Sequence, residues 1–181
     1  ALRMLRAERS VSEPTRSWLE EDGIIYFSVT SDGTTGEEWI ARLESKGFRV
    51  SDYAKQALRS PDFNPAKAGV TTEVAVLKGT LFNDTDRTTK NVRAEANRRN
   101  WTKPRPEVAC LIREMFSDKE LETMGFWWII AMHEPFKDSV GYPRLLVADR
   151  FGSGRWLGAS CGSPDCGWDH DDGFAFAVSQ V

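Results

Sequence analysis

Residues 125–134 read GFWWIIAMHE and form the most hydrophobic run in the chain. Apolar side chains occupy both alternating sets of positions, 126/128/130/132 and 127/129/131. A strand with one solvent-facing side alternates apolar and polar residues, so this run predicts a strand buried on both faces, at the centre of a sheet. About ten residues are too few to cross a bilayer as a helix.

The chain before this run alternates between short strands and helices. IIYFSVT and TTEVAVLK are rich in β-branched residues and predict strands at 24–30 and 71–78. Apolar residues at 108, 111, 112, 115 and 116 have the spacing of a core-facing helix. Ser117 and Glu120 form a capping box, which predicts a helix start. We expect helices at 37–46, 52–59, 87–99, 107–116 and 118–124.

After the central run, the sequence predicts three more strands, at 144–150, 155–161 and 173–179. Four consecutive strands with short connections favour an antiparallel meander and an α+β fold. We therefore predict a single α+β domain, residues 23–181, preceded by an N-terminal arm, residues 1–22. Its largely antiparallel sheet would have five or six strands, with helices 37–59 and 87–124 packed on one face.

Composition is that of a globular domain, with 181 residues of which 40% are hydrophobic and 28% charged. The net charge of −3 favours neither nucleic acid nor an anionic membrane surface. Charge is unevenly distributed: residues 78–105 carry 8 Lys/Arg against 3 Asp/Glu, and residues 106–181 carry 6 against 12. An acidic surface could meet the basic surface of another copy, and an aromatic-rich sheet covered on one face needs cover on the other, so we predict a homo-oligomer.

Cysteine content and the N-terminal sequence bear on the compartment. Three cysteines are too few for a secreted disulfide scaffold. The first ten residues, ALRMLRAERS, contain no apolar core of a signal peptide. We expect a cytoplasmic protein.

Four blocks carry a resemblance to known sequences: GTTGEEWIARLESKGFRVSDYAK, EVACLIREMFSD, MGFWWIIAMHEP and the closing GFAFAVSQ. From about residue 31 to residue 181, the chain resembles a family of short bacterial hypothetical proteins found in environmental genomes and on mobile integron gene cassettes. The resemblance implies a shared fold and a bacterial source. It implies no activity and assigns no functional residue.

A metal site is suggested by Cys161, Cys166 and His170, which have the spacing C-x4-C-x3-H, with His133 as a fourth ligand. Zinc prefers four nitrogen or sulfur ligands in a tetrahedron. Known structural zinc sites have paired short spacings, which this loop lacks, so two loop thiols and an exposed histidine are the competing interpretation.

A ligand pocket is suggested beside the central strand. By alternation His133 shares a face with Trp127, and it could line a pocket together with Arg150, Trp156 and Trp168. Aromatic walls with a few polar groups are typical of small-molecule sites. The competing interpretation is a hydrogen-bonded structural histidine at the end of a buried strand.

A third candidate is the basic segment 87–105. Its Lys and Arg residues flank Trp101, so phosphates could be held and a base stacked. The competing interpretation is a solvated helix face on an acidic protein that repels DNA, and we regard nucleic acid as the less favoured partner.

Taken together, these patterns favour a non-catalytic binding domain that self-associates and takes a small ligand in an aromatic pocket, or a protein partner. An enzyme is the alternative class, using either a metal at Cys161, Cys166 and His170 or His133 as a general base. No cofactor other than this candidate zinc is indicated.

Overall fold

The computed structural model describes residues 16–150, 152 and 154–180. Within them, nine strands form one mixed, mostly antiparallel sheet, and five α-helices pack around it. The strands are β1 (Leu19–Glu21), β2 (Ile24–Thr30), β3 (Arg49–Val50), β4 (Thr71–Lys78), β5 (Trp128–Ala131), β6 (Phe136–Lys137), β7 (Pro143–Asp149), β8 (Trp156–Cys161) and β9 (Asp172–Gln180). The helices are α1 (Gly36–Ser45), α2 (Asp52–Leu58), α3 (Thr89–Arg98), α4 (Glu107–Met115) and α5 (Asp118–Met124), with a 3-10 turn η1 (Gly79–Leu81).

The strand order is β1-β2-β4-β9-β5-β7-β8-β3, with β6 pairing to β7. The predicted central position of β5 is confirmed, because it lies between β9 and β7 in the middle of the sheet. Ile129, Ile130 and Ala131 are each at most 1% exposed, as a strand covered on both faces requires. The α+β class and the largely antiparallel sheet are confirmed as well. The predicted number of five or six strands is wrong, because the sheet has nine strands and three of them, β1, β3 and β6, have only two or three residues.

The predicted meander is only partly correct. Strands β5, β7 and β8 are consecutive antiparallel neighbours, but β9 lies between β4 and β5 and runs parallel to β5. The reason is that β9 is buried on both faces: Phe174 and Phe176 face one side, and the small side chains of Ala175 and Ala177 fit beneath the other. A strand of this kind belongs in the interior of a sheet rather than at its edge.

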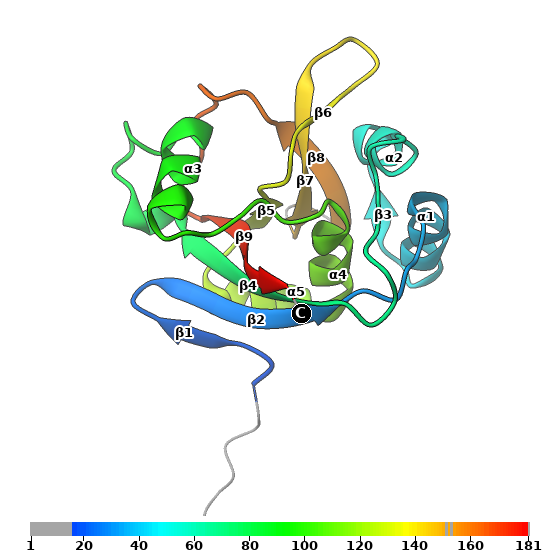
Figure 1. Ribbon diagram of the computed structural model, residues 1–181, viewed down its shortest axis with the longest axis horizontal. Coiled ribbons are helices and arrows are strands. Elements are labelled where there is room, and N and C mark those ends of the chain that lie inside the picture. Colours follow the sequence, from blue (N-terminus) through cyan, green and yellow to red (C-terminus); the bar gives the residue numbers. More distant parts are fainter. Residues whose placement is uncertain (1–15, 151, 153, 181) are drawn as a thin grey trace, which may run out of the picture.

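The helices do not all cover one face, which corrects a second expectation. Figure 1 shows α1, α2 and α4 on one side of the sheet and α3 on the opposite side. Val92 and Ala96 of α3 pack with Trp168, Phe174 and Ile130 in a core cluster of their own. Both faces of the sheet are apolar, so each needs a cover.

This arrangement weakens the reasoning behind the predicted self-association. That reasoning required an uncovered apolar face, and α3 together with Trp168 from the β8–β9 connection covers it.

The predicted arm, residues 1–22, falls mainly on residues 1–15, which lie outside the described residues. Its described part contains β1, which pairs with β2, and Trp18, which is buried in the core.

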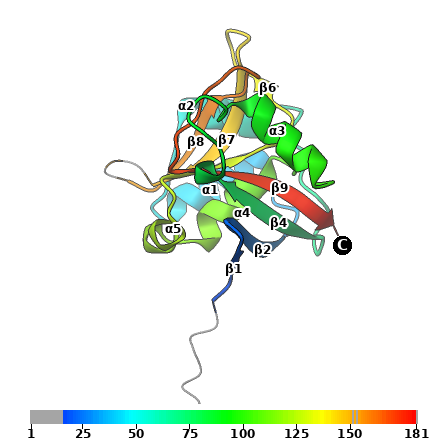
Figure 2. The ribbon, with the colours of Figure 1, turned by 90° about the vertical axis from the view of Figure 1, so that its left-hand side faces the viewer.

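The hairpin between β6 and β7 projects from one end of the molecule, as Figures 1 and 2 both show. Val140 and Tyr142 at its tip are exposed. In the described part of the chain, none of the helices is long and apolar enough to cross a membrane.

Candidate functional site

His133 is a buried structural residue in this fold. Its Nε2 accepts the backbone N–H of Leu146 at 2.9 Å, and its Nδ1 lies 2.7 Å from the carbonyl oxygen of Glu134. A carbonyl only accepts, so Nδ1 carries the hydrogen and the ring is neutral. Burial lowers the pKa of His133 to about 4. Both ring nitrogens are therefore engaged, and neither is available to a ligand or as a general base.

The other residues of the predicted aromatic pocket are dispersed. The guanidinium carbon of Arg150 lies 3.7 Å from the centre of the Trp127 ring, and that of Arg49 lies 5.5 Å from the centre of the Trp156 ring. Trp168 is buried against α3, where its Nε1–H donates to Thr89 Oγ1 at 2.9 Å. These residues lie at three separate places around the sheet rather than around one cavity.

The candidate zinc ligands are arranged differently from a metal site. Cys161 and Cys166 are joined in a disulfide, and a disulfide sulfur is not the thiolate that zinc binds. His170 is exposed, and its Nε2 lies 3.2 Å from Oδ1 of Asp171. Within the described residues, no three His, Cys, Asp or Glu side chains are grouped so that they could hold a metal ion.

The basic segment 87–105 does not present a continuous basic stripe. Arg98 and Arg99 share the carboxylate of Glu95, and the buried Arg87 donates to backbone carbonyls and to Asp84. Trp101 packs against Tyr26 and Phe176 with Arg99 over its ring. Most of the groups that would hold phosphates or stack a base are therefore already engaged within the chain.

Three other cations of this segment, Lys90, Arg93 and Lys103, line a cleft of about 550 Å³, whereas Arg105 donates to the carbonyl of Asn64. One wall is a face of α3 formed by Lys90, Arg93, Ala94 and Asn97, which have the spacing i, i+3, i+4 and i+7. This face is distinct from the core-facing stripe of Val92 and Ala96. Helix α3 thus binds the sheet with one face and lines the cleft with another.

The opposite wall comes from three segments that are far apart in the sequence. Glu134, Pro135 and Lys137 follow the central strand, Pro143 begins β7, and Gly162 and Pro164 follow β8; Lys103 lies at the rim. Three prolines give this wall a rigid apolar surface. The cleft therefore combines an apolar wall with charged side chains.

Charge in the cleft is unbalanced. Lys103 forms an ion pair with Glu134, and that hydrogen bond lowers the pKa of Glu134, which stays ionised. In the described part of the chain, Lys90, Arg93 and Lys137 take part in no ion pair. The cleft has four cationic side chains against one carboxylate.

Among the cations of the cleft, Arg93 is held in place by hydrogen bonds to the backbone. Its Nη1 and Nη2 donate to the carbonyl oxygens of Met132 and His133, each at 2.8 Å. Burial lowers the pKa of Arg93, with the Glu134 charge acting in the opposite direction, and an arginine remains protonated in proteins. A positive charge is thus held at the cleft by hydrogen bonds to two neutral carbonyls, without an ion-pair partner among the described residues.

Two of the other hollows are lined by residues of the predicted aromatic pocket, Trp127 in one and Trp156 in the other, and they are weaker candidates. A cavity of about 360 Å³ is lined by Trp127, Trp128 and three aspartates, but Trp127 already takes the Arg150 guanidinium as its cation. Burial raises the pKa of Asp172, one of those aspartates, to about 6. A hollow lined by Trp156 has only about 180 Å³, below the range of about 300–1,000 Å³ typical of ligand sites.

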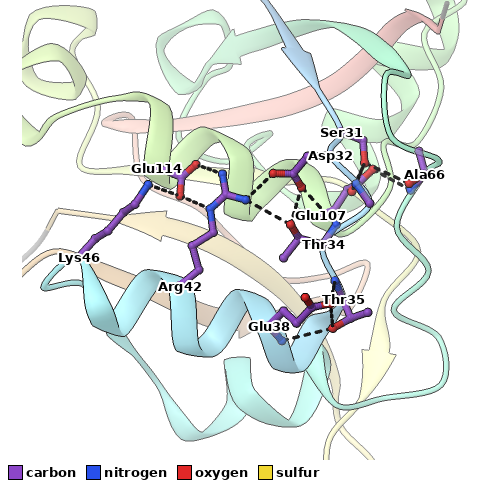
Figure 3. Close-up of polar contacts among 11 residues, drawn as sticks. Ser31, Asp32, Thr34, Thr35, Glu38, Arg42, Lys46, Ala66, Glu107 and Glu114 are labelled. Atoms are coloured by element: carbon purple, nitrogen blue, oxygen red, sulfur yellow. Dashed lines mark hydrogen bonds and ion pairs between the residues drawn. The ribbon is translucent and has the colours of Figure 1, made fainter.

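The polar cluster in Figure 3 has a structural role. Arg42 of α1 bonds Glu114 of α4 and Asp32, and the buried Glu107 accepts from Ser31 Oγ at 2.8 Å and from the Ala66 N–H at 2.9 Å. The labelled groups satisfy one another and fasten the β2–α1 loop to α4.

Comparisons with known proteins identify no relative: no family model, no curated protein and no solved structure matches the chain. The resemblance to integron-cassette proteins stays a prediction. Function must be argued from the cleft itself.

Proposed function

We propose that this protein binds a small organic anion in the cationic cleft between α3 and the chain segments that follow β5 and β8. The observation that carries the proposal is the convergence of Lys90, Arg93 and Lys137, without ion-pair partners among the described residues, on one cleft of about 550 Å³. Single surface lysines need no ligand. Three unmatched cations beside an apolar wall create a local positive potential that favours an anionic occupant.

The cleft suggests the chemistry of that anion. Carboxylate or phosphate oxygens would approach the ammonium groups of Lys90 and Lys137, which are exposed and free to move toward them. An apolar part of the ligand would lie against Pro135, Pro143 and Pro164. Asn97 offers a neutral donor and acceptor at the same helix face.

A binding role suits the site better than a catalytic one. The nearest histidine, His133, has both ring nitrogens engaged, and the carboxylate of the cleft, Glu134, is paired with Lys103. General acid–base chemistry needs a group that can reach the substrate and exchange a proton near neutral pH. Neither residue meets this requirement, because His133 is enclosed with both nitrogens bonded and Glu134 is ionised and paired with Lys103. This supports a non-catalytic domain.

Isothermal titration calorimetry with pyrophosphate, citrate and phthalate tests the proposal. We expect at least one of these anions to bind, more weakly as salt is raised. The Lys90→Gln/Lys137→Gln variant should lose about tenfold or more in affinity, equivalent to about 1.4 kcal/mol. The charge-matched control Lys67→Gln/Lys119→Gln alters exposed lysines elsewhere and should bind as the wild type does. Absence of binding to all three anions, or equal loss in both variants, would contradict the proposal.

A further inference from the structure

The loop that closes one side of the cationic cleft is tied by the disulfide between Cys161 and Cys166. Cys161 is the last residue of β8, where it lies opposite Arg144 of β7. The next residue, Gly162, donates its N–H to the carbonyl of Pro143 at 2.9 Å. One end of the loop is thus part of the sheet, and the disulfide fastens the other end to it.

The same loop holds the start of α3. The carbonyl of Cys166 accepts the N–H of Thr89 at 3.1 Å, and the carbonyl of Pro164 accepts the N–H of Lys90 at 2.9 Å. The first N–H groups of a helix have no partner within the helix, so external acceptors position its first turn. Here that first turn carries Lys90, and the following turn carries Arg93, so the loop positions the cations of the cleft.

Gly162 and Pro164 also line the cleft directly. The loop therefore acts on the site in two ways: it forms part of the wall, and it sets the position of the opposing helix. Both depend on the path of residues 162–165, which the disulfide constrains from its two ends.

A disulfide that closes so short a loop acts locally. The loss of unfolded-chain entropy that makes disulfides stabilising grows with loop length, and a six-residue loop lies at the low end. Cys161 and Cys166 are both half-buried rather than enclosed, so a small thiol can reach them. The third cysteine, Cys110, is fully buried in the core, where burial raises the pKa of its thiol well above the ordinary value and makes it unreactive.

We propose that the Cys161–Cys166 pair is a reversible redox modification site that controls the anion affinity of the cationic cleft. This inference rests on the function proposed above. With the bond formed, the loop fixes the first turn of α3 and the cleft is preorganised. With the bond broken, residues 162–165 and the first turn of α3 gain freedom, and the ligand must order them on binding.

The chemistry is thiol–disulfide exchange with a dithiol. A thiolate of the reductant attacks one of the two sulfurs, the S–S bond breaks, and the other cysteine leaves as a thiolate that takes up a proton. The second thiol of the reductant then displaces the first cysteine, which is also protonated. The protein gains two electrons and two protons, and the reductant is oxidised to a disulfide.

The experiment measures pyrophosphate binding to the full chain before and after treatment with dithiothreitol, an uncharged reductant that does not itself compete for a cationic site. We expect the affinity to fall about fivefold or more on reduction and to recover when excess oxidised dithiothreitol accepts the two electrons and two protons and the bond forms again, within the range of typical coupling between sites. Hydrogen exchange of the Thr89 and Lys90 amides should accelerate on reduction, whereas amides of β5 should not change.

Two variants sharpen the result. Cys161→Ser/Cys166→Ser should bind pyrophosphate as weakly as the reduced protein does, and dithiothreitol should not change its affinity. Cys110→Ala keeps the disulfide and should retain the full response. Equal affinity of the oxidised and reduced proteins, or unchanged exchange at Thr89 and Lys90, would overturn the redox control alone. Failure of the oxidised protein to bind any of pyrophosphate, citrate and phthalate would instead contradict the anion site, and the redox control of that site with it.

Discussion

Nη2 of Arg93 donates a hydrogen bond of 2.8 Å to the carbonyl oxygen of His133. This contact joins α3 to the chain as it leaves the central strand, and Nη1 makes the same bond to Met132. The two carbonyls lie just beyond the last residue of β5, where the ladder of the sheet ends. The guanidinium thus supplies both carbonyls with the hydrogen-bond donors that a neighbouring strand would otherwise provide. It also places a fixed positive charge in the cleft.

Replacing Arg93 by methionine should therefore destabilise the fold. The stem is retained, but two carbonyls lose their charged donors, and hydrogen bonds of this kind contribute about 1.5–3 kcal/mol each when context is favourable. Two such bonds would sum to about 3–6 kcal/mol. Because the Arg93 side chain is only half-buried, we expect a smaller loss of about 2–4 kcal/mol in the free energy of unfolding, measured by urea denaturation. Arg98→Met is the control, because the exposed Arg98–Glu95 pair should contribute at most about 1 kcal/mol. Similar losses in the two variants would contradict this role of Arg93.

His133 gives a pH-dependent prediction. Its folded pKa of about 4 lies below the ordinary value of 6.5, so between these values the unfolded chain binds a proton that the folded chain does not. Stability should be fully present above about pH 6.5 and fall as the pH drops toward 4, by about 3 kcal/mol from this residue.

The measurement is urea denaturation at several pH values between 4 and 7. His133→Gln should show a smaller loss than the wild type, and His170→Gln, which changes an exposed ring, is the control. The contribution of Asp172, whose pKa is raised and which therefore favours the folded state at low pH, is common to all three proteins and cancels in the comparison. Identical pH slopes for His133→Gln and the wild type would show that the ring is not buried neutral.

Local sequence patterns predicted the elements well, and the long-range arrangement less well. The predicted strands 24–30 and 71–78 coincide with β2 and β4, and the capping box at Ser117 does open α5. Such features depend on neighbouring residues. The insertion of β9 between β4 and β5 depends on pairing with strands about 40 and 100 residues away, which turn lengths alone do not encode.

For a similar reason, the sequence alone does not predict the cleft, although one of its walls could have been predicted from residue spacing. Lys90, Arg93, Ala94 and Asn97 form one helix face by spacing alone, and that face differs from the core stripe. The opposing prolines come from segments about 40 to 75 residues away, and only the fold brings them together. The short strands β1, β3 and β6, of two or three residues each, carry no periodicity from which a strand could be predicted.

The hydroxyl of Ser31 should be important because it forms a hydrogen bond with a buried carboxyl group. Ser31 Oγ donates to Glu107 Oε2 at 2.8 Å, and both residues are buried (Figure 3). Ser31→Ala removes this donor from a buried carboxylate, and we expect a loss of about 1–3 kcal/mol in unfolding free energy. The control is Thr30→Val, which removes an exposed hydroxyl bonded to Thr71 and should change stability by less than about 0.5 kcal/mol. A loss in Ser31→Ala no larger than that in Thr30→Val would contradict this role and mean that another donor compensates Glu107.

Gly36 should be irreplaceable for a steric reason. It begins α1, and a Cβ built on it would lie 1.6 Å from the carbonyl oxygen of Leu58, the last residue of α2. The obstacle is backbone, so it cannot rotate away as a side chain would, and α1 would have to separate from α2. Trp39 and Leu43 of α1 and Ala54 of α2 would then lose their close packing in the core cluster that they share. We therefore expect Gly36→Ala to cost about 3 kcal/mol or more, at the upper end of overpacking effects.

The matched control for this substitution is Gly167→Ala, because no atom lies within 4 Å of a Cβ built there. Urea denaturation of the two variants separates the steric effect from the general effect of adding a methyl group, which restricts the unfolded chain and stabilises by about 0.4–1 kcal/mol where the backbone allows it. Gly167→Ala should therefore be neutral or slightly stabilising. A Gly36→Ala variant as stable as the wild type would mean that α1 and α2 are not in direct backbone contact, and the packing of both helices on β7 and β8 would need to be revised.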